Sequence, residues 1–282
     1  MRNNNSLVNP YLAKCNYYKC NREKYLRKGT IFEHQNKTPA SVLYYILELW
    51  INDEFNGAKI TSKLKEKYKL DSMNIQFVYK FLQNCRIIIA NYMRTIYTLE
   101  PLSNKNANDN VVIDERLFTH ENGTAQWVVG LINLTNNQIR LEIVERRDTI
   151  TLQTIIEKHV LTGNNIYSDS WNGYNFLSLN NSGYNHIQYN HSAGHFGVTS
   201  RFEGIWGELK HSLKKIYSTI RSINFVYFLR EIEYRRMLKP LSKEEKMKNF
   251  AMIFSCVGNE KNGELLSDEE LKAIDYETLF GD

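Results

Sequence analysis

Apolar residues recur at steps of three and four along the first hundred residues, which is the spacing of one face of a helix. Between residues 40 and 55 the recurring apolar positions are Val42, Tyr45, Ile46, Leu49 and Trp50. The same spacing predicts helices over residues 58–68 and 74–93. Because a helix, a short turn and a longer helix are typical of a helix-turn-helix, residues 38–100 are predicted to form a helical module of that kind.

The pattern changes after a polar stretch at residues 101–110, where a domain boundary is expected. Short β-branched or alternating runs then predict strands, separated by segments with helical spacing. The predicted strands cover 111–113, 126–133, 138–144, 165–168 and 186–189, and the predicted helices cover 152–160, 200–217 and 223–237. Three strands joined by hairpins, followed by alternating helix and strand, predict an α/β domain over 111–237 with a mixed sheet and helices on its faces.

The two ends of the chain have a different character. Residues 1–37 are polar and contain the short unit CNYYKC, whereas residues 238–282 contain LSKEEKMKNF and SDEELKAID. The mixed charge of the last two segments is typical of exposed amphipathic helices, so a charged helical tail is expected there.

Composition narrows the class of protein only slightly. A net charge of +5 and a pI near 8.8 permit a nucleic-acid partner without demonstrating one. The four cysteines are scattered, which favours a reducing compartment over a disulfide framework. No apolar run reaches the roughly 18 residues that span a bilayer, and the first residues lack the apolar core of a secretory signal. We therefore expect an intracellular protein without a membrane partner.

Two aspartates follow predicted strands. Asp114 ends the run Val111–Val112–Ile113, and Asp169 directly follows the strand at 165–168. In a mixed sheet of this order the two strands are expected to be parallel neighbours, roughly 4.8 Å apart. Carboxylates this close repel each other unless a hard cation such as Mg²⁺ or Mn²⁺ lies between them. Two such ions can activate an attacking hydroxyl and stabilise the leaving oxygen of a phosphodiester. The alternative is that each aspartate is an ordinary turn or cap residue.

A third carboxylate lies on the predicted helix at 200–217. Glu203 flanks its apolar stripe, and Lys210 lies two turns later on the same face. A metal-binding carboxylate and a phosphate-binding cation make chemical sense together, although a solvated Glu/Lys face would have the same spacing. Glu115 and Glu208 are rival carboxylates, but Glu115 is expected to point away from the Asp114 face, and Glu208 lies on the opposite side of the helix from Glu203.

Several short motifs occur in one order along the chain. They are VVIDERLF, VVGLIN, RLEIVERRDTITLQTIIEKHV, GNNIYSDSWNGY, GYNHIQYNHS, GVTSRFEGIWGELKHSLKK and YFLREIEYRRM. Together they resemble the transposases of Merlin DNA transposons and the bacterial ISXO-type DDE transposases. The resemblance covers residues 111–237 and extends upstream through YLRKGTIFEHQNKTPASVLYYILELW.

The resemblance implies a ribonuclease-H-like fold in which Asp114, Asp169 and Glu203 bind two Mg²⁺ or Mn²⁺ ions. It also implies that Lys210 is the basic residue that follows the third carboxylate. The reaction implied is hydrolysis at transposon ends followed by transfer of the 3′-hydroxyl to target DNA, without a covalent protein intermediate.

The chain departs from the family pattern in two places. Relatives have an N-terminal zinc ribbon with two cysteine pairs, but only Cys15 and Cys20 are present here, in what reads as a zinc-ribbon remnant over residues 1–37. Since a structural zinc site needs four ligands, this pair is only half a site and zinc is not expected. Ser200 stands where relatives commonly have Asn.

Further residues are candidates for contact with DNA. On the helix at 74–93 the polar face predicted to contact DNA consists of Gln76, Lys80 and Gln83, with Tyr79 and Arg86 nearby. Two basic runs, Lys214–Lys215 and Arg235–Arg236, are candidates to contact the DNA backbone. The alternative for each group is an ordinary solvated face. His191 and His195 are candidates to touch phosphate or metal, and Trp171 and Tyr174 to stack on an unpaired base, with local hydrogen bonding and core packing as the alternatives.

The sequence thus predicts a DNA transposase that acts on terminal inverted repeats and target DNA. Its expected state is a homodimer or larger, because two DNA ends must be paired, and its expected place is with the DNA, in the nucleus of a eukaryote. A structure-specific nuclease of the same fold, and an inactive or domesticated DNA-binding descendant of a transposase, are the alternatives.

Overall fold

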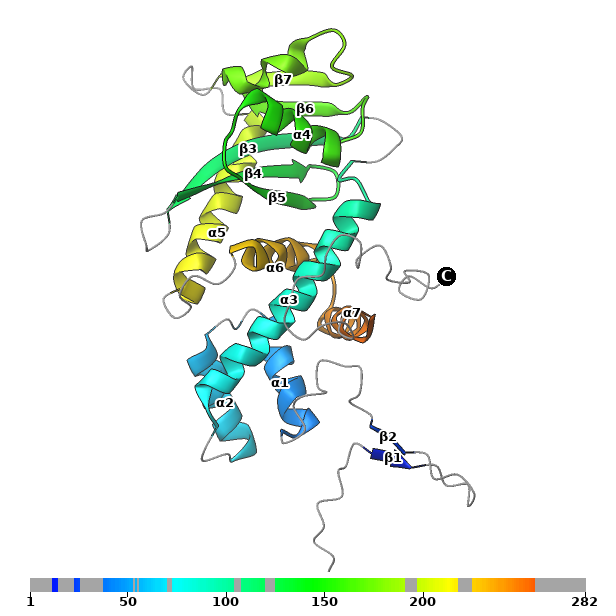
Figure 1. The fold of residues 1–282 in the computed structure, drawn as a ribbon. Coiled ribbons are helices and arrows are strands. Elements are labelled where there is room, and N and C mark those ends of the chain that lie inside the picture. The colour runs from blue at the N-terminus through cyan, green and yellow to red at the C-terminus, as the bar shows by residue number, and fades with distance from the viewer. Residues whose placement is uncertain are drawn as a thin grey trace, which may run out of the picture. The chain divides into compact units, whose positions relative to one another are not determined.

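A computed structural model defines the fold over most of the chain (Figure 1). The residues that it describes are 12–14, 23–25, 38–52, 54, 56–69, 73–103, 108–119, 125–190, 197–217 and 225–256. The chain divides into two compact units, one of Met1–Ile88 with Ser242–Asp282 and the other of Ile89–Leu241. The division falls inside a helix, whereas the sequence placed a boundary in the polar stretch 101–110.

The first unit is mainly helical. It contains α1 (Ala40–Ile51), α2 (Gly57–Tyr68), the first part of α3 (Ile75–Leu99), α7 (Lys243–Cys256) and a small antiparallel pair, β1 (Leu12–Lys14) with β2 (Glu23–Tyr25). The three helices expected from the apolar spacing are therefore present, and α7 lies where LSKEEKMKNF indicated a helix.

Apolar stripes hold the helices of this unit together. Val42 and Ile46 on α1, and Ile60 and Leu64 on α2, are buried. The indole of Trp50 meets the ring of Phe250 on α7 edge to face, with the centroids 5.4 Å apart. The side chain of Asn56 caps α2 by accepting hydrogen bonds from the backbone N–H groups of the first turn.

The second unit is built on a five-stranded mixed sheet (Figure 1). Its strands are β3 (Asn110–Thr119), β4 (Ala125–Asn133), β5 (Ile139–Val144), β6 (Asn165–Asp169) and β7 (Asn185–Tyr189). The order is β5-β4-β3-β6-β7, in which β3, β4 and β5 pair antiparallel while β3–β6 and β6–β7 are parallel. This order and these directions confirm the predicted ribonuclease-H-like mixed sheet.

Helices cover both faces of this sheet. They are α4 (Thr149–His159), the 3-10 helices η1 (Asn172–Ser178) and η3 (Gly197–Ser200), α5 (Arg201–Tyr217) and α6 (Phe225–Leu238). On one face Val111, Ile113 and Ile166 form a buried core with residues of α4 and η1. On the other face, the ring of Phe118 contacts Trp206 of α5 and Phe225 of α6.

The first strand of the sheet is longer than predicted. The sequence indicated a strand at 111–113 that ends in Asp114, but β3 continues to Thr119. Antiparallel pairing with β4 holds the extra residues, down to Thr119 opposite Ala125. Asp114 therefore lies within β3, whereas Asp169 is the last residue of β6, as expected.

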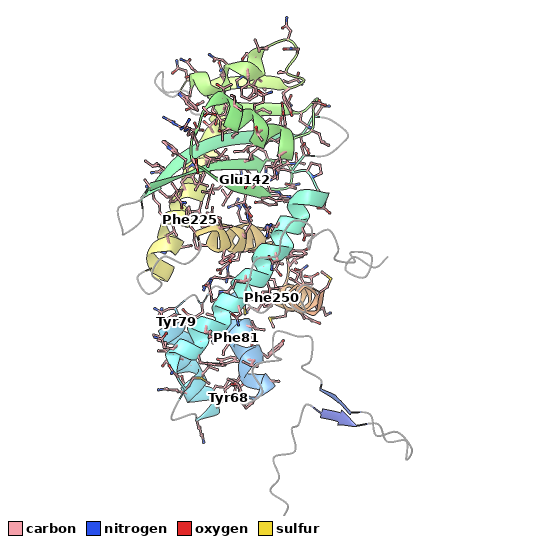
Figure 2. All side chains as sticks on the ribbon, in the orientation of Figure 1. Tyr68, Tyr79, Phe81, Glu142, Phe225 and Phe250 are labelled. Atoms are coloured by element: carbon pink, nitrogen blue, oxygen red, sulfur yellow. The ribbon has the colours of Figure 1, made fainter. Side chains whose placement is uncertain are left out.

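A buried ionic network joins α6 to the edge strand β5. Arg230 on α6 donates to Glu233 at 2.7 Å, to the carbonyl of Leu141 at 2.8 Å and to Glu142 at 3.2 Å. Glu142, labelled in Figure 2, also contacts Nε2 of the buried His159 at 2.8 Å. Because buried charges are stable only when paired, this network fixes α6 and α4 to β5.

Candidate active site

Asp114 lies on the face of the sheet that α5 covers. It pairs across the ladder with Gly130 of β4, and its Oδ2 accepts a 2.7 Å hydrogen bond from Nε1 of Trp206. Alternation along β3 explains the orientation, because Ile113 belongs to the core on the opposite face. The indole N–H therefore fixes one oxygen of the Asp114 carboxylate.

Asp169 reaches the same face from the neighbouring strand. The parallel ladder pairs Val111 with Ile166 and Val112 with Tyr167. The same register, continued beyond its last pair, sets Asp114 opposite Asp169. The Oδ1 of Asp169 accepts a 3.0 Å hydrogen bond from the backbone N–H of Trp171. The two aspartates, far apart in sequence, thus occupy opposing positions on one face of neighbouring strands, just beyond the last pair of the β3–β6 ladder.

Glu203 lies in the first turn of α5 with its side chain exposed. Its neighbour Phe202 and Trp206, one turn later, are buried against the sheet. Within the described ranges, no three His, Cys, Asp or Glu side chains come close enough to hold a metal ion. The structure brings the two aspartates together, and it places the third carboxylate on the helix that covers them without closing a three-ligand site.

Lys210 is also exposed on α5, further along the helix than Glu203. The rival carboxylate Glu208 is used elsewhere, because it accepts a 3.2 Å ion-pair contact from Arg236 of α6. Ser200, in η3, donates its hydroxyl to the carbonyl of Gly197 at 3.0 Å. Its hydroxyl thus closes the turn that leads into α5.

Glu115 points to the opposite face from Asp114, as alternation predicted. It accepts a short hydrogen bond from the hydroxyl of Tyr174, which is fully buried in η1. Burial raises the pKa of Glu115 to about 7; the hydrogen bond from Tyr174 opposes the rise, while the negative charges of Asp114 and Asp169 add to it. A third carboxyl group, that of Glu115, is therefore buried on the opposite face of the sheet from the two aspartates.

An arginine balances this acidic cluster. Arg147 follows β5, and its guanidinium carbon lies 4.3 Å from the ring centroid of Trp127 and 4.4 Å from that of Trp171. Its Nη1 is 3.6 Å from Oε1 of Glu115. The indole of Trp171 packs against Arg147 and Gly173 and lies edge-on to Tyr174. Of the two alternatives for Trp171, stacking on a base and packing within the protein, these contacts favour packing.

The predicted DNA-contacting residues of α3 fall into two groups. Gln76 and Lys80 are exposed in its first half. Gln83 is half-buried, and its side-chain nitrogen is sequestered from solvent. Arg86 is 4% exposed and lies over the ring of Trp50. The expectation that Arg86 faces DNA is corrected, because its aliphatic stem and guanidinium pack inside the helical unit.

Several predicted residues cannot be placed. Lys214 and Lys215 belong to α5, but their side chains lie outside the described residues, as do Cys15, Cys20, His191 and His195 altogether. Arg235 pairs with Glu231 at 2.9 Å, and Arg236 pairs with Glu208. Both arginines of that basic run are therefore engaged in ion pairs along α6 or with α5.

The donor set fits a hard divalent cation. Asp114 and Asp169 offer carboxylate oxygens from adjacent strands, and the hydrogen bonds from Trp206 and Trp171 engage one oxygen of each. Mg²⁺ and Mn²⁺ prefer oxygen ligands and usually take only one or two carboxylates together with water and phosphate. The arrangement thus suits an ion that also binds a phosphate ester.

Comparison with known proteins finds a family model that matches this region. Residues 102–236 match the model of the ISXO2-like transposase domain. No curated protein matches the chain. No helix in the described part of the chain has the length and apolar content needed to cross a bilayer.

Two solved structures are similar at low levels. One is the simian T-cell lymphotropic virus intasome in complex with the PP2A regulatory subunit B56 gamma, at 14% identity and a TM-score of 0.35. The match spans 46% of this chain and 49% of that one, so it extends over about half the length of the relative. The other is the HTLV-2 integrase catalytic core domain in complex with magnesium, in a trimeric form, at 11% identity and a TM-score of 0.32, over 49% of this chain and 87% of that one.

Proposed function

Because residues 102–236 form a domain of the ISXO-type DDE transposase family, we propose that this protein is a DNA transposase that cuts phosphodiester bonds at transposon ends and joins them to target DNA. The observation that supports the proposal most directly is the convergence of Asp114 and Asp169 on one face of the sheet from parallel, neighbouring strands. Such a pair is suited to metal-dependent phosphoryl transfer.

In this proposal Asp114 and Asp169 hold Mg²⁺ or Mn²⁺, and Glu203 completes the ligand set from α5. The bound ions would supply Lewis-acid activation of the attacking hydroxyl and charge neutralisation at the phosphate. Trp206 and the backbone N–H of Trp171 orient the two aspartates through one oxygen each. Lys210, exposed on the same helix as Glu203, is proposed to contact a DNA phosphate near the cut.

The partner is proposed to be duplex DNA, as terminal repeats and as target. Gln76 and Lys80 are exposed on α3 and are proposed to contact it in the first unit, and Lys214 and Lys215 are proposed to do so from α5. Since two transposon ends must be held together, the active form is proposed to be a dimer or larger, located with the DNA. Zinc has no part in the proposal.

The test uses the full chain and a supercoiled plasmid that contains the DNA flanking its gene as candidate ends. With Mg²⁺ or Mn²⁺, the parent protein is expected to nick the ends and to yield joined products. Asp169→Asn is expected to lower the rate by at least about 1000-fold, as the removal of a residue that acts with the others as a unit does. Gel analysis of cut and joined DNA measures both steps.

The other outcomes separate the alternative functions. Nicks without joined products would identify a nuclease of the same fold. Binding to the ends without any cleavage by the parent would identify a DNA-binding descendant of a transposase. Equal cleavage by Asp169→Asn and the parent would overturn the proposed active site. Glu208→Gln, which removes a carboxylate engaged with Arg236, is the matched control and is expected to cleave like the parent.

A further inference from the structure

The ladder between β3 and β6 ends before it reaches the aspartates. Its last pair is Val112 with Tyr167, so Asp114 and Asp169 lie beyond the backbone hydrogen bonds that join their strands. The two carboxylates repel each other across this gap. Asp114 remains paired with Gly130 of β4 and Asp169 with Tyr189 of β7, so the sheet holds each aspartate from its outer side and does not join the two directly.

The guanidinium of Arg147 lies between elements that meet at this point. It lies over two indoles that are remote in sequence, Trp127 on β4 and Trp171 after β6, at 4.3 and 4.4 Å from the ring centroids. A guanidinium that packs on aromatic rings is restrained in position, and it is stabilised by cation–π attraction. Arg147 thus joins β4 to the segment that follows Asp169.

The same guanidinium reaches the strand of Asp114. Nη1 lies 3.6 Å from Oε1 of Glu115, whose side chain is only 3% exposed. Among the described residues, no donor is within hydrogen-bonding distance of this oxygen, whereas the other oxygen of Glu115 accepts from Tyr174. The positive charge of Arg147 therefore compensates a buried acidic oxygen one residue from Asp114.

The link to Asp169 is equally direct. The residue whose indole stacks on Arg147 is the one whose backbone N–H donates to Oδ1 of Asp169. Gly173 leaves room for this indole, since a Cβ at that position would lie 2.3 Å from Cζ3 of Trp171. A displacement of the Arg147 side chain would remove one of the groups that hold the Trp171 indole, and the backbone N–H of the same residue donates to Asp169.

We infer that Arg147 is a positioning residue that sets the separation of Asp114 and Asp169 where the strand ladder no longer does so, by bridging Glu115 on β3 and Trp171 after β6. The inference rests on the proposed function, since it assigns a role within the same site. Groups that orient metal-binding carboxylates from outside the ligand set change metal affinity by about 10- to 100-fold when they are removed.

The test is a Mn²⁺ titration of the full-length protein, followed by the quenching of tryptophan fluorescence, with the thermal midpoint of unfolding recorded for each variant. Arg147→Met is expected to raise the Mn²⁺ concentration at half-saturation by about tenfold or more. Arg147→Lys, which keeps the charge without the flat guanidinium, is expected to recover part of the loss. Arg146→Met, a change at the adjacent exposed arginine, is expected to bind like the parent.

Asp169→Asn makes the two proposals separable. If Asp169→Asn weakens Mn²⁺ binding and Arg147→Met stays within twofold of the parent, the positioning role is overturned while the proposed site stands. If Asp169→Asn binds Mn²⁺ like the parent, the proposed site itself fails. If Arg147→Met does not fold, Arg147→Lys decides the question, because half-saturation equal to that of the parent would overturn the inference.

Discussion

Gly130 on β4 lies opposite Asp114 in the ladder and faces the rings of α5. A Cβ built there would lie 2.5 Å from Cε1 of Phe202 and 2.8 Å from Cη2 of Trp206. Both rings are buried, so neither can move aside without disturbing the core. The missing side chain at this position allows Trp206 to lie within hydrogen-bonding distance of Asp114.

Gly130→Ala is therefore expected to lower the free energy of unfolding by about 1–3 kcal/mol, the usual cost of overpacking a core. Urea denaturation followed by circular dichroism measures the change. Gly204→Ala is the matched control, because nothing lies within 4 Å of its Cβ position on α5. This control is expected to raise the stability by about 0.5–1 kcal/mol, as alanine does in a helix. A loss at Gly130 no larger than the change at Gly204 would contradict the packing argument.

At this scale the sequence predicted that Asp114 and Asp169 share one face of the sheet and that Glu115 points to the other face, because each depends only on strand order and alternation. It could not predict Arg147. The site of that side chain depends on two indoles from β4 and from the segment after β6, and their proximity follows from sheet register. A buried carboxylate such as Glu115 needs a cation nearby, and this need would have pointed to an arginine. The burial of Glu115, however, is known only from the structure.

The polar residues of helix α3 differ in how far they are buried. Lys80 is exposed near the start of the helix, whereas Arg86 is buried over Trp50. Both residues are cations and were candidates for contact with DNA. Loss of Lys80 should change DNA binding, whereas loss of Arg86 should change the stability of the fold.

Under the proposed function, Lys80→Ala is expected to weaken binding to duplex DNA and to lower the slope of log Kd against log salt by about one, the loss of a single phosphate contact. Arg86→Ala is expected to leave that slope unchanged and to lower the free energy of unfolding by about 1–3 kcal/mol through lost packing. Fluorescence anisotropy at several salt concentrations measures the slopes. An equal slope for Lys80→Ala and the parent would remove Lys80 from the DNA surface.

Helices with a regular spacing of apolar residues were predicted well, whereas strand residues that depend on pairing with another strand were not. The stripe on α5 specified a helix of nearly the observed length. The residues of β3 after Asp114 alternate poorly, and they are strand only because β4 offers a ladder out to Ala125. Pairing across a sheet is a non-local interaction that local propensity does not encode.

At the scale of the whole unit, the network around Glu142 ties four elements into one core. It joins Tyr97 at the end of α3, β5, His159 at the end of α4 and α6 through Arg230. Local patterning predicted the strand and the helix that contain Glu142, Arg230 and Glu233 but gave these three residues no role. Their burial follows from the packing of α6 on β5, so the sequence alone did not reveal it.

This network predicts a pH dependence of stability. Burial lowers the pKa of His159 below its ordinary value of 6.5, with the nearby Glu142 opposing the shift. A histidine with a depressed folded-state pKa contributes stability that is present above pH 6.5 and is lost as the pH falls towards that lower pKa. The parent is therefore expected to lose up to about 1.4 kcal/mol per pH unit more than His159→Gln in that window.

Urea denaturation of both proteins between pH 8 and pH 5 measures the difference. Gln retains a donor for Glu142 but does not titrate, and other titrating groups, such as Glu233, are common to both proteins and cancel. Parallel stability curves for the two proteins would mean that His159 is protonated equally in the folded and unfolded states.

The crossover between β3 and β6 has a consequence for synthesis. Strands β3, β4 and β5 follow one another as hairpins, but β6 joins β3 only after α4 has been made. A nascent chain that has left the ribosome as far as α4 can form the antiparallel meander while Asp114 still lacks Asp169 beside it. Since neither β6 nor Asp169 exists before the crossover is complete, an unfinished chain holds only half of the carboxylate pair and cannot assemble the proposed site.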